Sequence, residues 1–427
     1  MRKGLLFLSA CAVFLTALIG LPGAATAQEL RVRFTNPLCR EYVYPAPLPT
    51  QSGQLVKAKP KDIFCTRADL PFNLARPDGI YAEITRVLQE PGVARVTFAT
   101  MTYSHRELTA QLCVLEKRGV QVRLILDGGA DKKSAEELIK CGVEVTPVQW
   151  SGHLHHNKFI LVDYLPQTGR AASLVFSSAN FSNPGLTINH EMWGFYRPLQ
   201  PSLVVEQHRC LAEGLIALPT GGQPLAKAFN ECRTRVARQI QRPEPLQFFA
   251  IPFDSKKLVD ILTSQLRSSK IAKMTSNRFS FPAILAAVSL RPAGSPALQA
   301  VFDDDLFWMG VRPEPALDIE ARQEAGGGAF GSDPRRIREL EALGAQVRFA
   351  ETSAGAAQKM HSKYTIFDRL VVGGSGNYTA SGMTQNFENI YVFNDPFVHQ
   401  SFLRHFEALW KGSTQRGMMP KANIEPK

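Results

Sequence analysis

The order of apolar and polar residues along the chain predicts a regular alternation of strands and helices. From residue 95, apolar runs of strand length are separated by segments with helical spacing. We therefore expect βαβ units around a buried, largely parallel sheet. The expected strands are 95–102, 120–127, 143–148, 158–162 and 172–177, and the expected helices are 106–118 and 134–140.

The second half of the chain repeats this order. Its expected strands are 270–275, 298–302 and 346–349, and its expected helix is 283–290. The strand-ending Asp127 has a counterpart in Asp303. An amphipathic helix follows each half, at 203–215 and at 397–410. The repetition predicts an internal duplication.

One polar motif occurs twice, once in each half. Residues 156–163 and 361–368 both read His-x-Lys-x-x-x-x-Asp, and a Ser-x-Asn and a glutamate follow each copy at matched spacing. Residues i and i+2 of a strand face the same side, so each histidine and its lysine are expected to point into one cleft. The first set is His156, Lys158, Asp163, Ser178, Asn180 and Glu191, and the second is His361, Lys363, Asp368, Ser375, Asn377 and Glu388.

These residue types suit the cleavage of a phosphodiester. An anionic phosphorus centre resists attack, so an enzyme must neutralise its oxygens, supply a nucleophile and protonate the leaving oxygen. Two lysines and two asparagines offer the charge and the hydrogen-bond donors, and two histidines offer the nucleophile and the acid. The pattern thus calls for no metal and no other cofactor.

Over residues 90–415 the chain resembles the phospholipase D superfamily, in particular the members that carry two such motifs. The resemblance implies an α/β fold of two pseudo-symmetric α/β/α sandwich domains, with mixed, largely parallel sheets and both motifs at the domain interface. It also implies a phosphohistidine intermediate, with His156 as the nucleophile and His361 as the general acid and base, although the pseudo-symmetry permits the reverse.

The resemblance further implies supporting roles for the other motif residues. Glu191 and Glu388 would each orient a histidine through its second ring nitrogen. Asp163 and Asp368 would face away from the phosphate and hold the backbone or form a salt bridge. The family's glycine before the motif serine is Gly374 in the second copy but Ser177 in the first. We expect a slight backbone adjustment there.

Three functions fit these motifs to different degrees. The leading one is hydrolysis of phospholipid headgroups to phosphatidic acid at an anionic membrane surface, with transfer to another alcohol as a variant; no obligatory protein partner is implied. A metal-independent endonuclease is the alternative, since basic proteins favour polyanions. Four arginines scattered through the linker support it: Arg233, Arg235, Arg238 and Arg242. A non-catalytic phosphate-binding protein would show decay of one motif, and both motifs are intact.

The amino terminus has the layout of a cleavable signal peptide. A basic start precedes an apolar run over 5–21 and a small-residue exit at 25–27. Export to a periplasm or the extracellular space is therefore expected, with a lipoprotein attached through Cys11 or an uncleaved anchor as alternatives. Removing Arg2 and Lys3 from the net charge of +11 would leave +9.

Six cysteines follow the expected cleavage site, all in the first half of the chain. An even number is compatible with three disulfides, for which fifteen connectivities exist, and pairing of Cys39 with Cys65 is favoured. The six are Cys39, Cys65, Cys113, Cys141, Cys210 and Cys232. None forms a Cys-x-x-Cys pair, which argues against a structural zinc site.

The expected domain organisation follows from these features. A signal peptide (1–27) and an extension (28–90) precede the first domain (91–232), and a linker (233–245) leads to the second domain (246–415) and a tail (416–427).

The second half carries an insertion between Asp303 and His361, which we place within residues 307–332. It could be a lid or a surface loop. The acidic run 303–305 before it could hold a divalent cation, but such runs more commonly form a turn or cap a helix.

Overall fold

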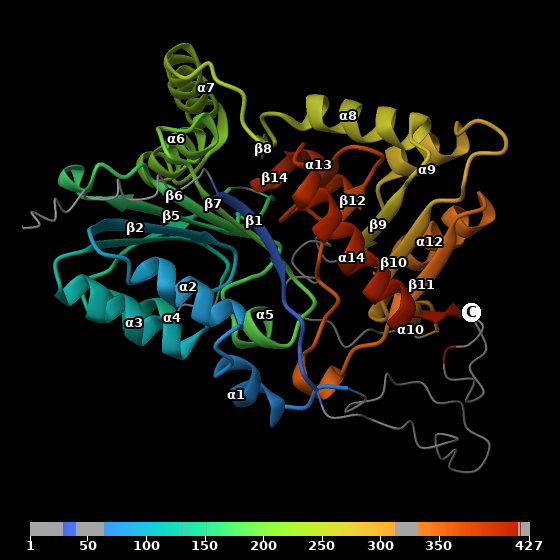
Figure 1. Cartoon of the computed structure of the whole chain (residues 1–427), viewed down its shortest axis with the longest axis horizontal. Coiled ribbons are helices and arrows are strands. Elements are labelled where there is room, and N and C mark those ends of the chain that lie inside the picture. The colour runs from blue at the N-terminus through green and yellow to red at the C-terminus, as the bar shows by residue number, and fades with distance from the viewer. Residues whose placement is uncertain are drawn as a thin grey trace, which may run out of the picture.

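The computed structural model describes residues 29–39, 64–130, 133–150, 152–311, 332–416 and 419. The expected signal peptide, most of the tail and most of the insertion lie outside these residues. Figure 1 shows two α/β lobes side by side, one coloured blue to green and the other yellow to red. This confirms the predicted fold of two mixed α/β domains.

The first lobe is a seven-stranded sheet in the order β1-β7-β6-β5-β2-β3-β4. Its strands are β1 (Glu29–Phe34), β2 (Val93–Thr100), β3 (Gln121–Asp127), β4 (Glu144–Val148), β5 (Phe159–Tyr164), β6 (Ser173–Ser177) and β7 (Met192–Arg197). Strands β2, β3 and β4 are parallel, whereas the other neighbours pair in antiparallel fashion. The parallel part thus consists of the strands joined by helical crossovers.

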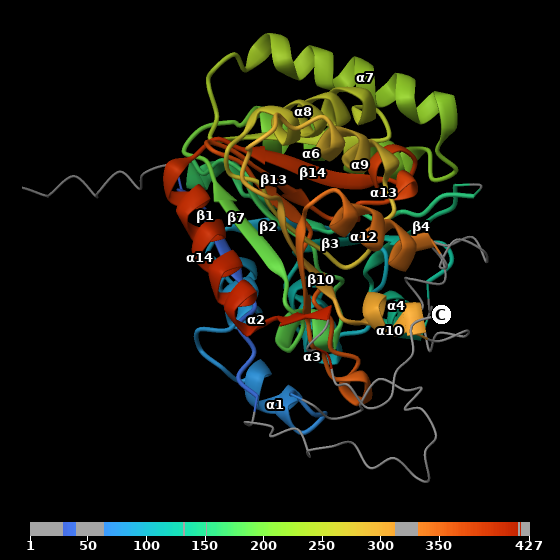
Figure 2. The same ribbon diagram turned by 90° about the vertical axis from the view of Figure 1, so that its right-hand side faces the viewer.

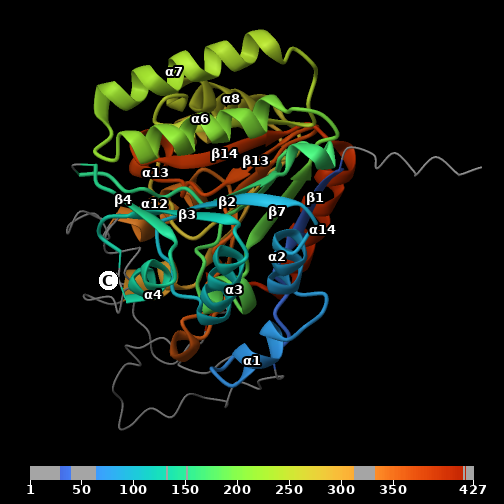
Figure 3. The ribbon, with the colours of Figure 1, turned by 90° about the vertical axis from the view of Figure 1, so that its left-hand side faces the viewer.

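Helices cover both faces of this sheet (Figure 3). The helices α2 (Ile80–Leu88), α3 (Arg106–Lys117) and α4 (Lys133–Lys140) bury their apolar sides on one face. The helices α6 (Leu203–Ala217) and α7 (Gly222–Gln239) lie on the other. Ser202 caps α6 by accepting a hydrogen bond from Val205 N, which satisfies one of the free donors of its first turn.

The second lobe is an eight-stranded sheet in the order β15-β11-β10-β9-β12-β13-β14-β8. Its strands are β8 (Leu246–Ile251), β9 (Lys273–Ser276), β10 (Gln299–Asp303), β11 (Gln346–Ala350), β12 (Tyr364–Ile366), β13 (Val371–Gly374), β14 (Glu388–Phe393) and β15 (Thr414–Gln415). Parallel pairing joins β9, β10 and β11, and the motif-bearing side is antiparallel, as in the first lobe.

The second lobe also has helices on both faces. They are α8 (Ser255–Ser268), α9 (Pro282–Ser289), α10 (Asp305–Val311), α12 (Ser332–Ala342), α13 (Ala380–Thr384) and α14 (Pro396–Gly412). Asp395 caps α14 ahead of Pro396, an arrangement that fixes the start of the helix. No helix in the described ranges has both the length and the apolar character needed to span a bilayer.

A shared apolar core holds the two lobes together. One buried cluster contains residues of β5, β6 and β7 together with residues of β8, β12 and β14. Within it Phe176 stacks on Tyr391 with ring centroids 3.9 Å apart. Because such burial is the main favourable contribution to association, the lobes are expected to behave as one packed unit.

The segment before the first lobe joins this arrangement. Strand β1 pairs antiparallel with β7 at the edge of the first sheet, and α14 of the second lobe runs along it (Figure 2). The ring of Phe34 stacks on His405 of α14 with centroids 3.8 Å apart. Two short helices, α1 (Asp69–Leu74) and α5 (Asn183–Thr187), lie beside each other below the sheet.

Helix α7 occupies the first part of the expected linker, because it continues to Gln239. A short connection then leads to β8. The disulfide Cys210–Cys232 fastens α7 to α6, Cys113–Cys141 joins α3 to the end of α4, and Cys39–Cys65 lies in the first segment. The prediction of three disulfides is confirmed.

Candidate functional site

The two motif segments approach each other where the lobes meet. His156 and Lys158 directly precede β5, and His361 and Lys363 directly precede β12. All four residues are buried, with at most 2% of their surface exposed. The expected catalytic groups are therefore enclosed between two rigid sheets rather than carried on surface loops.

Each histidine is held by a glutamate of the opposite lobe. Nδ1 of His156 lies 2.7 Å from Oε2 of Glu388, and Nδ1 of His361 lies 3.0 Å from Oε2 of Glu191. A carboxylate accepts hydrogen bonds, so each Nδ1 carries a proton. The sequence pattern paired glutamates with histidines but did not show that the pairs cross between lobes.

The motif serines hold these glutamates from within their own lobes. Ser178 Oγ donates to Glu191 Oε2 at 2.6 Å, and Ser375 Oγ donates to Glu388 Oε2 at 2.5 Å. Each hydroxyl also accepts the backbone N–H of the residue after the glutamate. The serines thus fix the carboxylates that orient the histidines.

The electrostatics keep Glu191 ionised. Burial acts to raise its pKa, but the charges of His361 and Lys363, together with hydrogen bonds from His361 and Ser178, outweigh that effect and lower the pKa. Two further histidines beside the site stay neutral, because burial lowers the pKa of His155 to about 3 and of His190 to about 4.

The backbone joins the lobes at the same two points. His156 N donates to Phe387 O at 2.8 Å, and His361 N donates to His190 O at 2.9 Å. The acceptors are the residues directly before the two glutamates. A short segment of the opposite lobe therefore holds each histidine twice, once at its backbone N–H and once at its ring.

Two asparagines that the sequence analysis missed support these segments. Asn189 and Asn386 each donate to the glutamate two residues further on, at 3.2 and 3.4 Å. Their Oδ1 atoms accept from the opposite lobe, from Lys359 N at 2.9 Å and from Leu154 N at 3.2 Å. An Asn-x-Glu in both copies was the signal that could have revealed them.

The motif asparagines lie in tight turns before short helices. Asn180 O accepts from Ser182 N, the cap of α5, and Asn377 O accepts from Thr379 N, the cap of α13. A Cβ atom on Gly185 would come within 2.3 Å of Asn180 O. Gly382 makes the equally close approach in the second lobe, so only glycine lets each helix pack against its asparagine turn.

The strand-ending aspartates position the residue before each motif histidine. Asp127 Oδ2 accepts from His155 N at 2.7 Å, and Asp303 Oδ2 accepts from Met360 N at 2.6 Å. The sequence analysis paired these aspartates as landmarks of the duplication. Their contacts give them a structural role beside the site.

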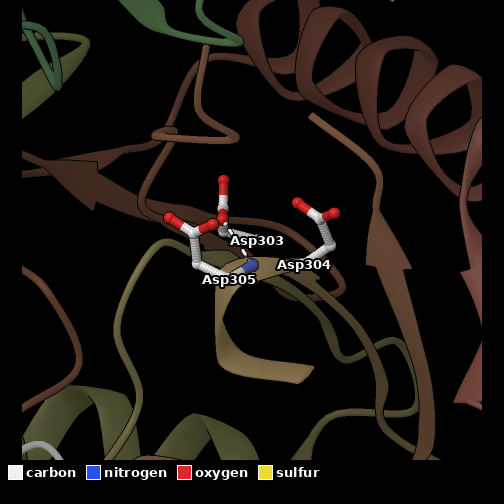
Figure 4. A group of neighbouring side chains, drawn as sticks. All are labelled: Asp303, Asp304 and Asp305. Carbon is white, nitrogen blue, oxygen red and sulfur yellow. Dashed lines mark hydrogen bonds between the residues drawn. The ribbon is translucent and has the colours of Figure 1, made fainter. Parts of the chain in front are cut away.

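The acidic run 303–305 forms a turn and a helix start (Figure 4). Among the described residues, these three carboxylates lie close enough together to hold a metal ion. Asp303 Oδ1 accepts from Asp305 N at 2.8 Å, and Asp305 pairs with Lys359. Asp304 accepts from the backbone and side chain of Thr352 and from the indole of Trp308. These carboxylates are already used as protein acceptors, which agrees with the interpretation as a turn and cap.

The last residue of each motif points to the scaffold. Asp163 forms salt bridges with Arg95 at 2.8 Å and with Arg209 at 2.6 Å, whereas Asp368 accepts the N–H groups of Lys270 and Ile271. Ser177, at the position of the missing glycine, exchanges hydrogen bonds of 3.0 Å with the backbone of Ala179.

Replacing Asp163 by asparagine should lower the free energy of unfolding by about 2 kcal/mol, because the partly buried arginines would lose their counter-charge. Burial opposes ionisation of Asp163, but Arg209 and Arg95 lower its pKa below 3.8 overall. Its contribution to stability is therefore present above pH 3.8 and is lost as the pH falls through the lowered value. Urea unfolding at several pH values measures both effects.

Asp260→Asn is the matched control for this variant, since Asp260 pairs with Lys256 on the exposed face of α8 and such pairs contribute little. Equal losses of stability in the two variants would contradict the structural role of Asp163.

The comparisons with known proteins agree with this geometry. Residues 85–197 and 327–410 match the model of a family described as "Cardiolipin synthase, PLD-like domain". A mitochondrial cardiolipin hydrolase of Chlamydomonas reinhardtii is 40% identical over 81 residues, which are 19% of this chain and 33% of that protein. The protein of the same name from Xenopus tropicalis is 25% identical over 162 residues, 38% of this chain and 64% of that protein. The chain thus matches about one to two thirds of the length of these relatives.

A solved structure supports the fold. The phosphatidylserine synthase of Haemophilus influenzae Rd KW20 has a TM-score of 0.54 and 12% identity, over 81% of this chain and 87% of that one. The fold and the comparisons together define a protein of two α/β lobes, each with one copy of the motif. The chain belongs to the phospholipase D superfamily.

The comparisons correct one expectation from the sequence. The curated relatives are named as mitochondrial proteins, which overturns the expected export to a periplasm or the extracellular space. The physical reason is that a basic and apolar leader is a general targeting pattern. Its charge and hydropathy do not by themselves specify the compartment.

Proposed function

We propose that the chain hydrolyses phospholipid phosphodiesters and releases phosphatidic acid, through a covalent intermediate on His156. The observation that carries the proposal is the crosswise pair of histidine–glutamate contacts, His156 with Glu388 and His361 with Glu191. The names of the curated relatives, which are cardiolipin hydrolases, favour a phospholipid over other phosphodiesters.

The mechanism uses Nε2, the second ring nitrogen of each motif histidine. Nε2 of His156 attacks phosphorus, and the bond to the leaving alcohol breaks as His361 gives that oxygen its Nε2 proton. His361 then takes a proton from water, whose oxygen attacks the phosphohistidine and restores His156. Lys158, Lys363 and the two motif asparagines neutralise and bind the non-bridging oxygens.

Each glutamate stabilises the positive charge that its histidine carries during the cycle. Glu388 holds the Nδ1 proton of His156 as Nε2 becomes bonded to phosphorus, and Glu191 stabilises the protonated form of His361 before the alcohol leaves. Since the residues themselves supply charge, nucleophile and acid, the proposed reaction requires no metal.

The alternative of a nuclease rests on the basic composition of the chain. Two of the arginines that favoured it are engaged within the protein, Arg233 with Asp254 and Arg242 with Gln200. These contacts weaken the case for a nucleic-acid surface on α7 and the connection after it, so phospholipid is the preferred substrate class.

The test compares substrates with excess chelator present throughout. Purified protein is incubated with vesicles of cardiolipin, vesicles of phosphatidylcholine, single-stranded DNA and double-stranded DNA, each beside the His156→Ala variant. We expect phosphatidic acid from one of the lipids with wild-type protein alone. DNA cleavage without lipid hydrolysis would overturn the proposal in favour of a nuclease, and activity that disappears with chelator would contradict the metal-free mechanism.

A further inference from the structure

The two halves of the site differ in the residue that follows each glutamate. This residue is Met192 in the first lobe and Asn389 in the second. Asn389 Oδ1 accepts from Lys158 N at 2.6 Å, and its Nδ2 donates to Lys158 O at 3.4 Å. The side chain thus holds both backbone groups of the motif lysine of the opposite lobe, which a methionine cannot do.

A chain of buried hydrogen bonds continues from Asn389. Its Nδ2 lies 3.3 Å from the hydroxyl of Tyr391, and this hydroxyl lies 2.7 Å from Nε2 of His208 in α6. Nδ1 of His208 lies 2.8 Å from Val204 O. Asn389, Tyr391 and His208 are all fully buried, so none of these groups can exchange its partner for bulk water without opening the lobe interface.

The chemistry of the last acceptor fixes the direction of every bond in this chain. A carbonyl oxygen only accepts, so His208 Nδ1 carries the proton and Nε2 must accept from Tyr391. The phenol oxygen then accepts from Asn389 Nδ2, which leaves Asn389 Oδ1 to accept from Lys158 N. Burial lowers the pKa of His208 to about 3, so the neutral ring that this arrangement requires is maintained near neutral pH.

The first lobe has different residues at the positions that correspond to Asn389 and Tyr391. The position that corresponds to Tyr391 is Gly194, where an added Cβ would lie 2.1 Å from the ring of Phe176. Phe176 instead stacks on Tyr391 itself. The ring of Phe176 therefore fills the space that a side chain at position 194 would need. The difference between the two halves is part of the packing of the interface.

We propose that Asn389, Tyr391 and His208 are positioning residues that hold Lys158, and that they give the two motif lysines unequal roles. The inference rests on the proposed function, in which Lys158 binds a non-bridging phosphate oxygen. Lys158 Nζ donates to His156 O at 3.1 Å, so the direction of the amine depends on the same stretch of backbone that Asn389 holds. These hydrogen bonds fix the lysine on the His156 side, whereas Met192, at the position that corresponds to Asn389, has no amide with which to hold a backbone.

The experiment is a double-mutant comparison of Tyr391→Phe with Lys158→Met. Tyr391→Phe removes one hydroxyl and keeps the ring that stacks on Phe176. We expect it to reduce both kcat and the affinity for inorganic phosphate about tenfold, in line with the loss of one buried hydrogen bond. In the Lys158→Met background the same change should alter phosphate affinity less than about twofold, because the group it positions is gone.

Tyr164→Phe is the matched control, since Tyr164 is a buried tyrosine of β5 whose hydroxyl bonds Glu90 at 2.6 Å away from the site. It should change phosphate affinity less than about twofold in either background. The proposal would be overturned if Tyr391→Phe changed phosphate affinity equally with and without Lys158. It would also be overturned if a Tyr391→Phe variant with a normal melting temperature bound phosphate like the wild type. If Tyr391→Phe does not fold, Asn389→Leu, of similar shape, takes its place.

Phosphate binding is measured by calorimetry and does not depend on turnover. A protein that binds phosphate with the expected coupling but hydrolyses no lipid would contradict the proposed function and leave the positioning role supported. Hydrolysis of lipid without coupling between Tyr391 and Lys158 would support the proposed function and contradict the positioning role.

Discussion

Replacing His156 by alanine should lower kcat by about 10⁴-fold or more, because the reaction would lose the atom that bonds to phosphorus. The change should leave the fold intact, since an apolar core that includes Phe176 and Tyr391 joins the two lobes. Circular dichroism and the release of phosphatidic acid from cardiolipin vesicles measure the two quantities. A variant that retains a tenth of the activity would contradict the assigned nucleophile.

The partner histidine provides the complementary result. With a p-nitrophenyl phosphodiester, whose leaving group needs no proton, His361→Ala should still form the phosphoenzyme but should hydrolyse it slowly. Acid-labile phosphate on His156, located by mass spectrometry, is the expected observation. Phosphate found on His361 in the His156→Ala variant would reverse the two roles, which the pseudo-symmetry of the motifs allows.

Replacing Glu388 by glutamine should lower kcat about 100-fold with a small change in KM. The amide can offer its N–H to Nδ1 and so favour the wrong tautomer, and it supplies no charge to the ring. Because Glu388 contacts His156 rather than the histidine of its own lobe, the slow step should be formation of the phosphoenzyme. Rapid-quench measurements of that step test the assignment.

Glu191→Gln should instead slow the steps that depend on His361, with which Glu191 shares two oxygen contacts of 2.9 and 3.0 Å. Glu206→Gln is the control for both variants, since Glu206 binds Arg209 on α6 rather than a motif histidine. If Glu388→Gln impaired the His361 steps and Glu191→Gln the His156 step, the crosswise contacts would not describe the working enzyme.

Local patterns revealed much of the fold. The expected strand at 120–127 is β3 (Gln121–Asp127), and the expected helix at 106–118 is α3 (Arg106–Lys117). These elements follow from periodic burial, which is a property of neighbouring residues. The antiparallel half of each sheet depends on strands distant in sequence, such as β8 beside β14, and periodicity does not specify such partners.

The candidate site shows the same division between local and distant information. Matched spacing identified the histidines, lysines, asparagines and glutamates, because duplication preserves spacing. It did not show which glutamate holds which histidine, since that depends on how the lobes face each other. Asn389 escaped notice for a related reason: its counterpart is Met192, so a search for matched residues passes over a position where the halves differ.

The crosswise contacts also bear on how the protein is made. During synthesis the first lobe leaves the ribosome before residue 388 has been added, so His156 has no carboxylate at Nδ1 at that stage. His361 and its lysine are likewise absent from the unfinished chain. Under the proposed function, a growing polypeptide therefore carries only half of the site, and hydrolysis begins only when the finished second lobe has docked on the first.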